Sequence, residues 1–336
     1  MNSIQQLRNA LDRLRTPQGL WIAAEHFEPH NRYDYVWTRD VVQIIYAHLF
    51  VEDYGAVQRA AALLFELARK YQSQLEPGCD HHTTHGRFPI KFDWRHLNRV
   101  DPWNHLQNDA LGAMLWLPQQ CRAHGLELLD AEWKKELLVK IVRYLKYIEY
   151  WKNADAGYWE ENNEVRASSV GICVAGLKAA KAVGIPVPSE MIEAGLNTLR
   201  HLLPNETPTR PYDAATLSLI WPYNVVDPKM ARTIVDRVAG NLLRRNGVIR
   251  YPNDHYHGGP GRECEWVFLK IQLGICSKLT SYDGLMAKAL DYGRSLLHRH
   301  GALPEAFYGG TDHPNPNRNL AWSDAWAICA ERIAHN

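Results

Sequence analysis

The 336-residue sequence lacks the features that mark several large classes of protein. No stretch approaches the roughly 20 consecutive apolar residues that a membrane-spanning helix needs. The first fifteen residues, MNSIQQLRNALDRLR, contain no apolar run of the kind that directs secretion, so a cytoplasmic protein is expected. The 38 basic and 37 acidic residues nearly cancel, which argues against nucleic acid or another polyanion as a partner.

Closely spaced cysteine pairs and nucleotide-binding glycine patterns are also missing. Of the six cysteines, Cys173, Cys276 and Cys329 lie in apolar helical segments, where a thiol behaves as a small hydrophobic side chain. A disulfide framework is therefore not expected. Without a glycine-rich phosphate loop or a GxSxG motif, the sequence gives no support to nucleotide-dependent or serine-nucleophile chemistry.

Aromatic residues, by contrast, are abundant. There are 12 tryptophans and 16 tyrosines, and many lie in polar segments rich in glycine and proline. Rings in helices usually belong to the core, whereas rings in loops beside carboxylates more often form a binding surface. Sugars bind well to such a surface because their C–H faces are apolar.

Helical periodicity dominates the chain and predicts about twelve helices. They are expected near residues 3–14, 39–51, 55–72, 105–123, 131–152, 167–183, 188–202, 212–220, 227–243, 263–278, 281–299 and 320–333. No strand alternation is evident, although short strands inside the loops remain possible.

Long and short connections alternate between these helices. The long ones lie near residues 15–38, 73–104, 153–166, 203–211, 244–262 and 300–319. Because alternate connections between antiparallel helices emerge at the same end, the long loops should share one face, where function concentrates. The pattern predicts an all-α fold, an (α/α)6 barrel of six helical hairpins forming a single domain over 1–336. An open helical solenoid is the alternative, disfavoured by the lack of a fixed sequence repeat.

Two glutamates in the long loops suit the hydrolysis of glycosides, which needs two carboxyl groups. In GYWEE at 157–161, the indole, the shortage of water and the adjacent carboxylate should keep Glu160 protonated, as a general acid must be. In LPEAFY at 303–308, Glu305 stands alone among apolar residues and could supply the second carboxyl. Alternatively, Glu160 and Glu161 could be acidic residues that stabilise a helix dipole, and Glu305 could be an ordinary surface residue.

Two other segments combine charge with aromatic rings. In YDYVWTRD at 33–40, Arg39 and Asp40 offer donors and acceptors to sugar hydroxyls, or else form an ion pair in which Thr38 or Asp40 caps a helix. The segment RYPNDHY at 250–256 is either the rim of a substrate site or a turn.

Two acidic or histidine-rich segments are assigned no catalytic role. His81, His82 and His85 resemble a metal cluster, but one short loop rarely supplies a complete ligand set, so no metal is predicted. Glu263 and Glu265 are interpreted as dipole partners at the start of a helix.

Five ordered blocks resemble glycoside hydrolase family 15, the glucoamylase and glucodextranase family, and the related α subunit of phosphorylase kinase. The blocks are YDYVWTRD at 33–40, WNHLQNDALG at 103–112, GYWEE at 157–161, RYPNDHY at 250–256, and LPE at 303–305 with NLAWSDAWAICA at 319–330. They extend over nearly the whole chain. The resemblance implies an (α/α)6 barrel, in agreement with the helix count, and a reaction that needs neither metal nor organic cofactor.

By this resemblance, Glu160 is the general acid, Glu161 a supporting carboxylate and Glu305 the general base that activates water. The residues expected to bind the substrate, by holding a terminal glucose or lining its pocket, are Tyr33, Trp37, Arg39, Asp40, Trp103, Trp159, Glu161, Arg250 and Tyr256. The implied activity is that of an inverting, exo-acting α-glucosidase that releases β-glucose from the non-reducing end. Inversion needs room for a water, so the two catalytic carboxyl groups should lie ~6.5–9.5 Å apart.

The sequence departs from the family pattern at two points. Ala306 follows the base where many members have glutamine, and a helix from about residue 3 implies that the N-terminal β-sandwich of many prokaryotic members is absent. A bare barrel suits short glucosides of the maltose or isomaltose type better than starch. The alternatives are a catalytically silent sugar-binding or regulatory protein of the kinase-subunit type, and a trehalase or disaccharide phosphorylase. Linkage and oligomeric state do not follow from the sequence.

Overall fold

The computed structural model describes residues 2–25, 33–77, 79, 83, 86–282 and 284–335. The helices are α1 (Ser3–Arg13), α2 (Thr38–Phe50), α3 (Tyr54–Lys70), α4 (Asn108–Ala123), α5 (Glu132–Tyr147), α6 (Ala167–Ala182), α7 (Ser189–Leu202), α8 (Pro228–Asn241), α9 (Val267–Leu279), α10 (Leu285–His300) and α11 (Ala321–His335), with 3-10 helices η1 (Gln72–Leu75) and η2 (Ala214–Leu219). The predicted helices are confirmed within a few residues at most of their ends.

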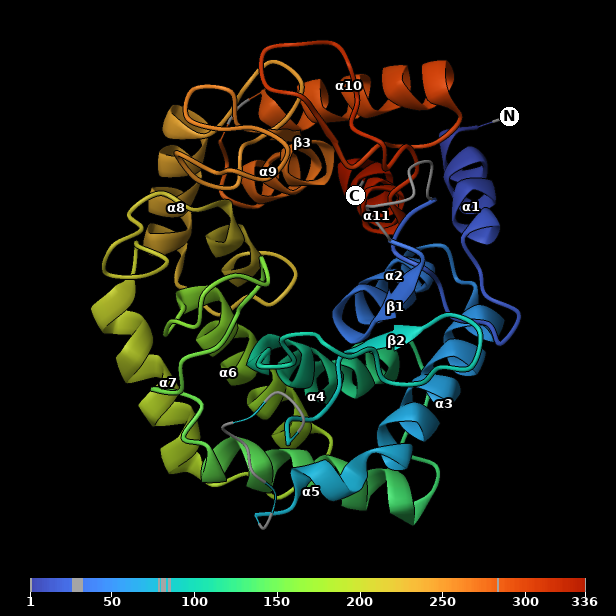
Figure 1. The fold of residues 1–336 in the computed structure, drawn as a ribbon, viewed down its shortest axis with the longest axis vertical. Helices are drawn as coiled ribbons and strands as arrows, with labels where there is room; N and C mark the ends of the chain where they lie inside the picture. The colour runs from blue at the N-terminus through green and yellow to red at the C-terminus, as the bar shows by residue number, and fades with distance from the viewer. Residues whose placement is uncertain are drawn as a thin grey trace.

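The helices form two concentric rings (Figure 1). In the inner ring, α2 packs against α4, α4 against α6, α6 against η2, η2 against α9, α9 against α11, and α11 returns to α2. Each inner element follows one outer helix in the chain, namely α1, α3, α5, α7, α8 or α10. The predicted all-α (α/α)6 arrangement is thereby confirmed, and the contact between α11 and α2 excludes an open solenoid.

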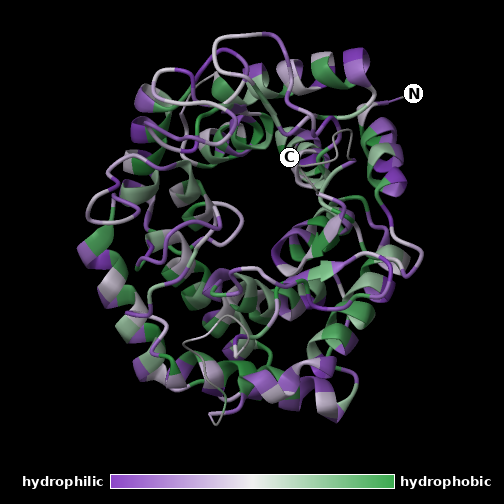
Figure 2. Cartoon of the chain, in the orientation of Figure 1, coloured by the Kyte–Doolittle hydropathy of each residue, from purple (hydrophilic) through white to green (hydrophobic). Residues whose placement is uncertain are grey.

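Inner and outer helices differ in burial, as expected from their positions in the two rings. The inner helices are buried on almost every side, as the continuous buried run Ala167–Leu177 of α6 illustrates, whereas the outer helices turn hydrophilic faces outward (Figure 2). Packing is tightest where α4 crosses α6. A Cβ atom added at Gly176 would lie 2.2 Å from the carbonyl oxygen of Gly112, so the two helix backbones touch there.

One predicted α-helix is absent from the inner ring. The segment near 212–220 forms the short 3-10 helix η2 instead, and prolines flank it at 211 and 222. Within η2, the hydroxyls of Thr216 and Ser218 donate to backbone carbonyls three residues earlier. Flanking prolines and side chains that compete for backbone groups both limit an α-helix, and the sequence periodicity does not reveal either effect.

The helix predicted from residue 263 begins at Val267, so the interpretation of two acidic residues was wrong. Glu265 lies in a strand and accepts hydrogen bonds from the backbone N–H groups of Asn246 and Gly310. Glu263 accepts one from the backbone N–H of Asn253. Both carboxylates therefore join loop segments and do not act as partners of a helix dipole.

Two short antiparallel sheets lie in the long connections. Strand β1 (Tyr35–Trp37) pairs with β2 (Lys91–Asp93), and β3 (Glu265–Trp266) pairs with β4 (Ala306–Phe307). The first sheet ties the loop after α1 to the loop after α3, and the second ties the loop after α8 to the loop after α10. The long loops thus support one another at one end of the barrel.

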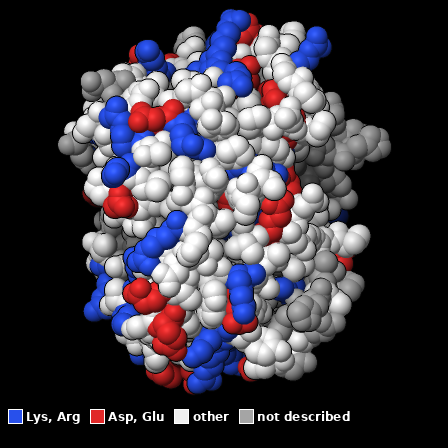
Figure 3. Space-filling view, turned by 90° about the vertical axis from the view of Figure 1, so that its left-hand side faces the viewer, with Lys and Arg blue, Asp and Glu red and all other residues white. Residues whose placement is uncertain are grey.

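The surface carries both signs of charge. On the face in Figure 3, basic and acidic side chains are intermixed, in keeping with a formal net charge of +1. Among the described helices, none combines the length and apolar character that crossing a membrane requires.

Candidate active site

A pocket of about 510 Å³, including its mouth, lies at the end of the barrel that carries the long loops. The lining residues come from four long loops and from the first turns of three inner helices: Ala23, Tyr33, Trp37, Arg39, Asp40, Tyr158, Trp159, Glu160, Arg250, Trp266, Phe268, Glu305, Leu320 and Trp322. Segments distant in sequence therefore meet there, as the alternation of long and short connections predicts.

Most of the site residues expected from the sequence line this pocket. These are Tyr33, Trp37, Arg39, Asp40, Trp159, Glu160, Arg250 and Glu305. Trp103, Glu161 and Tyr256 do not belong to the lining. Trp103 packs edge-on against Trp37 with 6.3 Å between ring centroids, and its ring lies 3.4 Å from the ammonium nitrogen of Lys91. It therefore supports the pocket wall from behind.

Arg39 is a buried cation that orients the groups around it. Its Nη1 donates to Gln107 Oε1 at 3.0 Å and to Asp109 Oδ2 at 3.3 Å, while its Nη2 donates to Glu160 Oε1 at 3.3 Å. Of the alternative, an ion pair with a helix cap, the ion pair is present, with Arg39 Nε 3.7 Å from Asp40 Oδ1, but the cap is wrong. The residue that precedes α2 is Trp37, and no side chain caps this helix.

Asp40 lies beside Arg39 in an environment unusual for a carboxyl group. Burial raises the pKa of Asp40 to about 7; the charge of Arg39 opposes this shift, and the charges of Glu160 and Asp109 add to it. Near neutral pH the carboxyl is therefore protonated in a substantial fraction of molecules. It can then donate a hydrogen bond to a hydroxyl as well as accept one.

Glu160 owes its position to a tight turn after α5. Gly157 and Glu160 both have left-handed backbone conformations, with φ of 63° and 60°. Gly157 is required because a Cβ atom there would lie 2.2 Å from the side chain of Arg166. The N–H of Glu160 donates to the carbonyl of Gly157 at 3.2 Å, and that of Glu161 donates to Ala156 at 3.0 Å. Glu160 lines the pocket, whereas Glu161 does not.

Glu305 is completely buried and held by several donors. The hydroxyl of Tyr256 lies 3.1 and 3.0 Å from its two oxygens, Asn317 Nδ2 donates to Oε2 at 2.9 Å, and Asn315 Nδ2 also donates to Oε2. The hydroxyls of Tyr33 and Tyr256 are 2.7 Å apart. Tyr256 thus acts on the site through Glu305, and the sequence analysis missed both asparagines.

Part of the aromatic wall was missed as well. Phe268 and Trp322 stack with 4.8 Å between centroids, and Tyr158 and Trp266 complete this side of the pocket. Trp322 belongs to the block NLAWSDAWAICA, but nothing in that block indicates which of its two tryptophans faces the site. Together with Trp37 and Trp159, these rings provide apolar faces for a sugar ring.

The histidine-rich segment leaves the metal question open. His81, His82 and His85 lie outside the described residues, and within the described residues no group of three or more metal-ligating side chains occurs. The charged groups that line the pocket are the carboxyls of Glu160, Glu305 and Asp40 and the guanidinium groups of Arg39 and Arg250. Such a set can exchange protons with a substrate and bind hydroxyl groups.

Comparison with known families gives one match over more than half of the chain. The family model of glycosyl hydrolases family 15 matches residues 1–203. The α regulatory subunit of phosphorylase b kinase from skeletal muscle of Oryctolagus cuniculus is 28% identical over 176 residues, which are 46% of this chain and 14% of that subunit. This chain therefore corresponds to a small part of the kinase subunits that it resembles.

Other relatives are enzymes by name. Isomaltose glucohydrolase of Kribbella flavida is 26% identical over 262 residues, covering 73% of this chain and 65% of that protein. The structure of a wild-type glycosidase superposes with a TM-score of 0.79 and 22% identity, over 99% of this chain and 97% of that chain. Glucoamylase from Saccharomycopsis fibuligera superposes with a TM-score of 0.69 and 15% identity, over 99% and 94% of the two chains. The two structural similarities establish the fold.

Proposed function

Since the chain belongs to glycosyl hydrolases family 15, we propose that it is a glycoside hydrolase, namely an inverting, exo-acting α-glucosidase that releases β-glucose from short α-glucosides. The observation that carries the proposal is that Glu160 and Glu305 line one pocket with Arg39, Asp40 and a wall of aromatic rings. In this proposal residues 1–336 form a single (α/α)6 catalytic domain.

The proposed reaction uses the two glutamates in opposite roles. The protonated carboxyl of Glu160 donates its proton to the glycosidic oxygen as the bond from that oxygen to C1 breaks, so the leaving sugar departs as an alcohol. The carboxylate of Glu305 accepts a proton from a water whose oxygen attacks C1 from the opposite face. The products are β-glucose and the shortened glycoside. Proton exchange with solvent then restores Glu160 to the acid form and Glu305 to the carboxylate.

The surroundings of each carboxyl support this assignment. Glu305 accepts three different donors, which fix the carboxylate and leave it ready to bind a water. Glu160 is the more accessible of the two, with 17% of its side chain exposed, as suits a group that must reach a leaving oxygen. The separation of ~6.5–9.5 Å between the two carboxyl groups that inversion requires remains a prediction.

Short glucosides are the proposed substrates. The polar side chains Arg39, Asp40 and Arg250 would bind the hydroxyls of one terminal glucose, and Trp37 and Trp159 would contact the faces of its ring. The similarity to isomaltose glucohydrolase over 73% of this chain makes isomaltose the first substrate to test.

The decisive experiment follows the anomer of released glucose by proton NMR. Maltose, isomaltose and trehalose are incubated separately with the protein and with its Glu160→Gln and Glu305→Gln variants. We expect β-glucose to appear first from one disaccharide and its release to fall by at least about 100-fold in both variants, because each loses a group for proton transfer. Early α-glucose would contradict inversion, and full activity in either variant would contradict the assignment of that residue.

A second candidate is a sugar-binding or regulatory protein without hydrolytic activity. It is favoured by the 28% identity to regulatory subunits of phosphorylase b kinase over 176 residues. Binding of a disaccharide, measured by calorimetry, without release of glucose would support it. The presence of both Glu160 and Glu305 in the pocket favours hydrolysis instead.

A further inference from the structure

Glu160 adopts a backbone conformation that its residue type disfavours. Its φ of 60° lies in the left-handed region, which costs energy for any residue with a Cβ atom and persists only where the surroundings enforce it. The two backbone hydrogen bonds of the turn, to Gly157 and Ala156, do not depend on side chains, and Arg39 Nη2 holds one carboxyl oxygen of Glu160 at 3.3 Å. The residues on either side of Glu160 supply the additional restraint.

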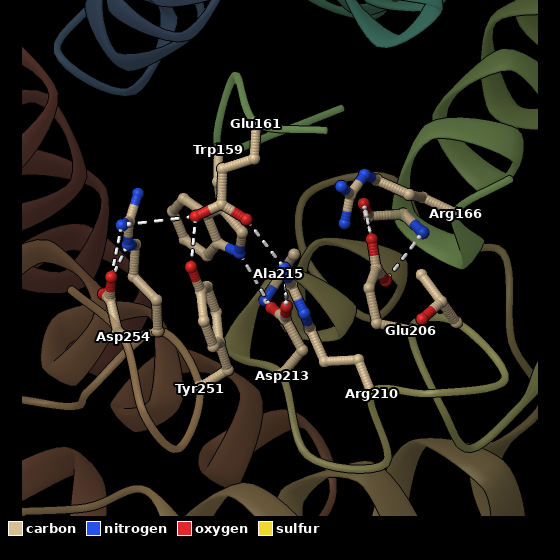
Figure 4. A network of polar contacts seen from close by, with 12 residues as sticks. Trp159, Glu161, Arg166, Glu206, Arg210, Asp213, Ala215, Tyr251 and Asp254 are labelled. Atoms are coloured by element: carbon tan, nitrogen blue, oxygen red, sulfur yellow. Dashed lines mark hydrogen bonds and ion pairs between the residues drawn. The ribbon is translucent and has the colours of Figure 1, made fainter. Parts of the chain in front are cut away.

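The residue before Glu160 is fixed by a buried carboxylate. Trp159 Nε1 donates to Asp213 Oδ1 at 2.8 Å, and Asp213 has only 2% of its surface exposed (Figure 4). The same oxygen accepts the backbone N–H of Ala215 at 2.8 Å, so Asp213 is itself anchored to the start of η2. The indole that forms the pocket wall next to the acid cannot turn without breaking this bond.

The residue after Glu160, Glu161, is fixed by Arg210, which also pairs with Asp213. Arg210 Nη1 lies 2.9 Å from Glu161 Oε2 and 3.3 Å from Asp213 Oδ2, so one guanidinium joins the two acids. The other oxygen of Glu161 accepts the hydroxyl of Tyr251 and lies 3.3 Å from Arg250 Nη2. Glu161 is thereby engaged on both oxygens (Figure 4), and it is not among the residues that line the pocket.

We propose that the pair Arg210–Asp213, on the connection between α7 and η2, positions the general acid by clamping both of its neighbours, Trp159 and Glu161. Arg210 and Asp213 touch neither substrate nor the reacting atoms, so they are positioning residues. The proposal rests on the assignment of Glu160 as general acid. It also gives Glu161 a role different from the substrate binding expected from its sequence block.

The test exploits the dependence of acid catalysis on the leaving group. Departure of a sugar alcohol needs a proton, whereas departure of fluoride from α-glucosyl fluoride needs little help. In Asp213→Asn, we expect kcat for the hydrolysed disaccharide to fall by about 100-fold, the cost of moving a catalytic group by about 1 Å. For α-glucosyl fluoride we expect kcat within about threefold of the wild-type value, because departure of fluoride needs little proton donation and Glu305 keeps all its donors.

Two further variants keep the result interpretable. Glu331→Gln changes a buried acid that bonds to Arg294 and contacts neither the pocket nor the clamp, and it should leave both substrates unaffected. Arg210→Met removes the other half of the clamp and should reproduce the selective loss if Asp213→Asn does not fold. Equal losses on both substrates in the folded clamp variants would overturn the proposal, because they would indicate a general structural role.

The same measurements test the assignment of Glu160 as the general acid, on which this inference rests. If Glu160→Gln keeps its activity on the disaccharide, the proposed role of Glu160 is wrong. If Glu160→Gln shows the selective loss and both clamp variants retain full activity on the disaccharide, only the inference about Arg210 and Asp213 fails.

Discussion

Replacement of Tyr256 by phenylalanine tests how the base is held. The ring of Tyr256 packs against Trp266 with 5.2 Å between centroids and lies 5.0 Å below the guanidinium of Arg250, and phenylalanine preserves both contacts. The variant loses only the hydroxyl, which donates to Glu305. A hydrogen bond to a charged group contributes about 1.5–3 kcal/mol. Because the two asparagine donors remain, we take the lower figure.

That figure predicts a measurable change in rate. A loss of about 1.5 kcal/mol corresponds to a roughly 10-fold reduction in kcat/KM.

The assay is the measurement of kcat/KM for hydrolysis of the best disaccharide. Tyr292→Phe provides a matched control, since its hydroxyl bonds to Asn246 and not to a pocket residue. A kcat/KM for Tyr256→Phe equal to that of the wild type would refute the reasoning that this hydroxyl maintains the base.

Three other outcomes are expected. Gly176→Ala should destabilise the fold by about 3 kcal/mol or more, because the new methyl group meets the backbone of Gly112. Gly240→Ala, where the methyl group enters open space, should be neutral or stabilise the fold by up to about 1 kcal/mol. Equal melting temperatures of the two variants in calorimetry would contradict this. Burial, and secondarily the charge of Asp213, raises the pKa of Glu206 to about 8, so the folded protein loses stability as pH rises from about 4.5 to 8. In that window Glu206→Gln should gain stability over the wild type by up to about 1.4 kcal/mol per pH unit. A difference in unfolding free energy that does not change with pH, measured by chemical denaturation, would refute the shift. Dialysis against a chelator should leave kcat unchanged, and a loss that zinc restores would implicate the histidines at 81–85.

Much of the fold could be predicted because its determinants are local. Apolar spacing identified the helices, and the alternation of long and short connections indicated that the loops share an end. The 3-10 helix Ala214–Leu219 was missed because its hydroxyls bond to carbonyls within the same segment, which periodicity cannot show. The start of α9 was misplaced because Glu265 pairs with strands and loops distant in the sequence.

The site was only partly predictable for a related reason. Glu160 and Glu305 stand in recognisable blocks, so the pair of carboxyls was correctly expected to line a pocket. Asn315 and Asn317 matter only because the last long loop folds back over Glu305, a contact that sequence spacing does not encode. Likewise, the direction of Glu161 depends on the φ angle of its neighbour, and no property of the string GYWEE reveals that angle.

The left-handed conformation at position 160 sets stability against activity. Asparagine or glycine adopts this conformation more readily than glutamate, whose strain is on the order of 1 kcal/mol or more. Replacement of Glu160 by asparagine or glycine should therefore make the protein more heat-resistant, less the contribution of the contact with Arg39. A library screened for thermal resistance alone would accumulate inactive members at this position. A lineage released from selection for hydrolysis would be expected to lose this glutamate early.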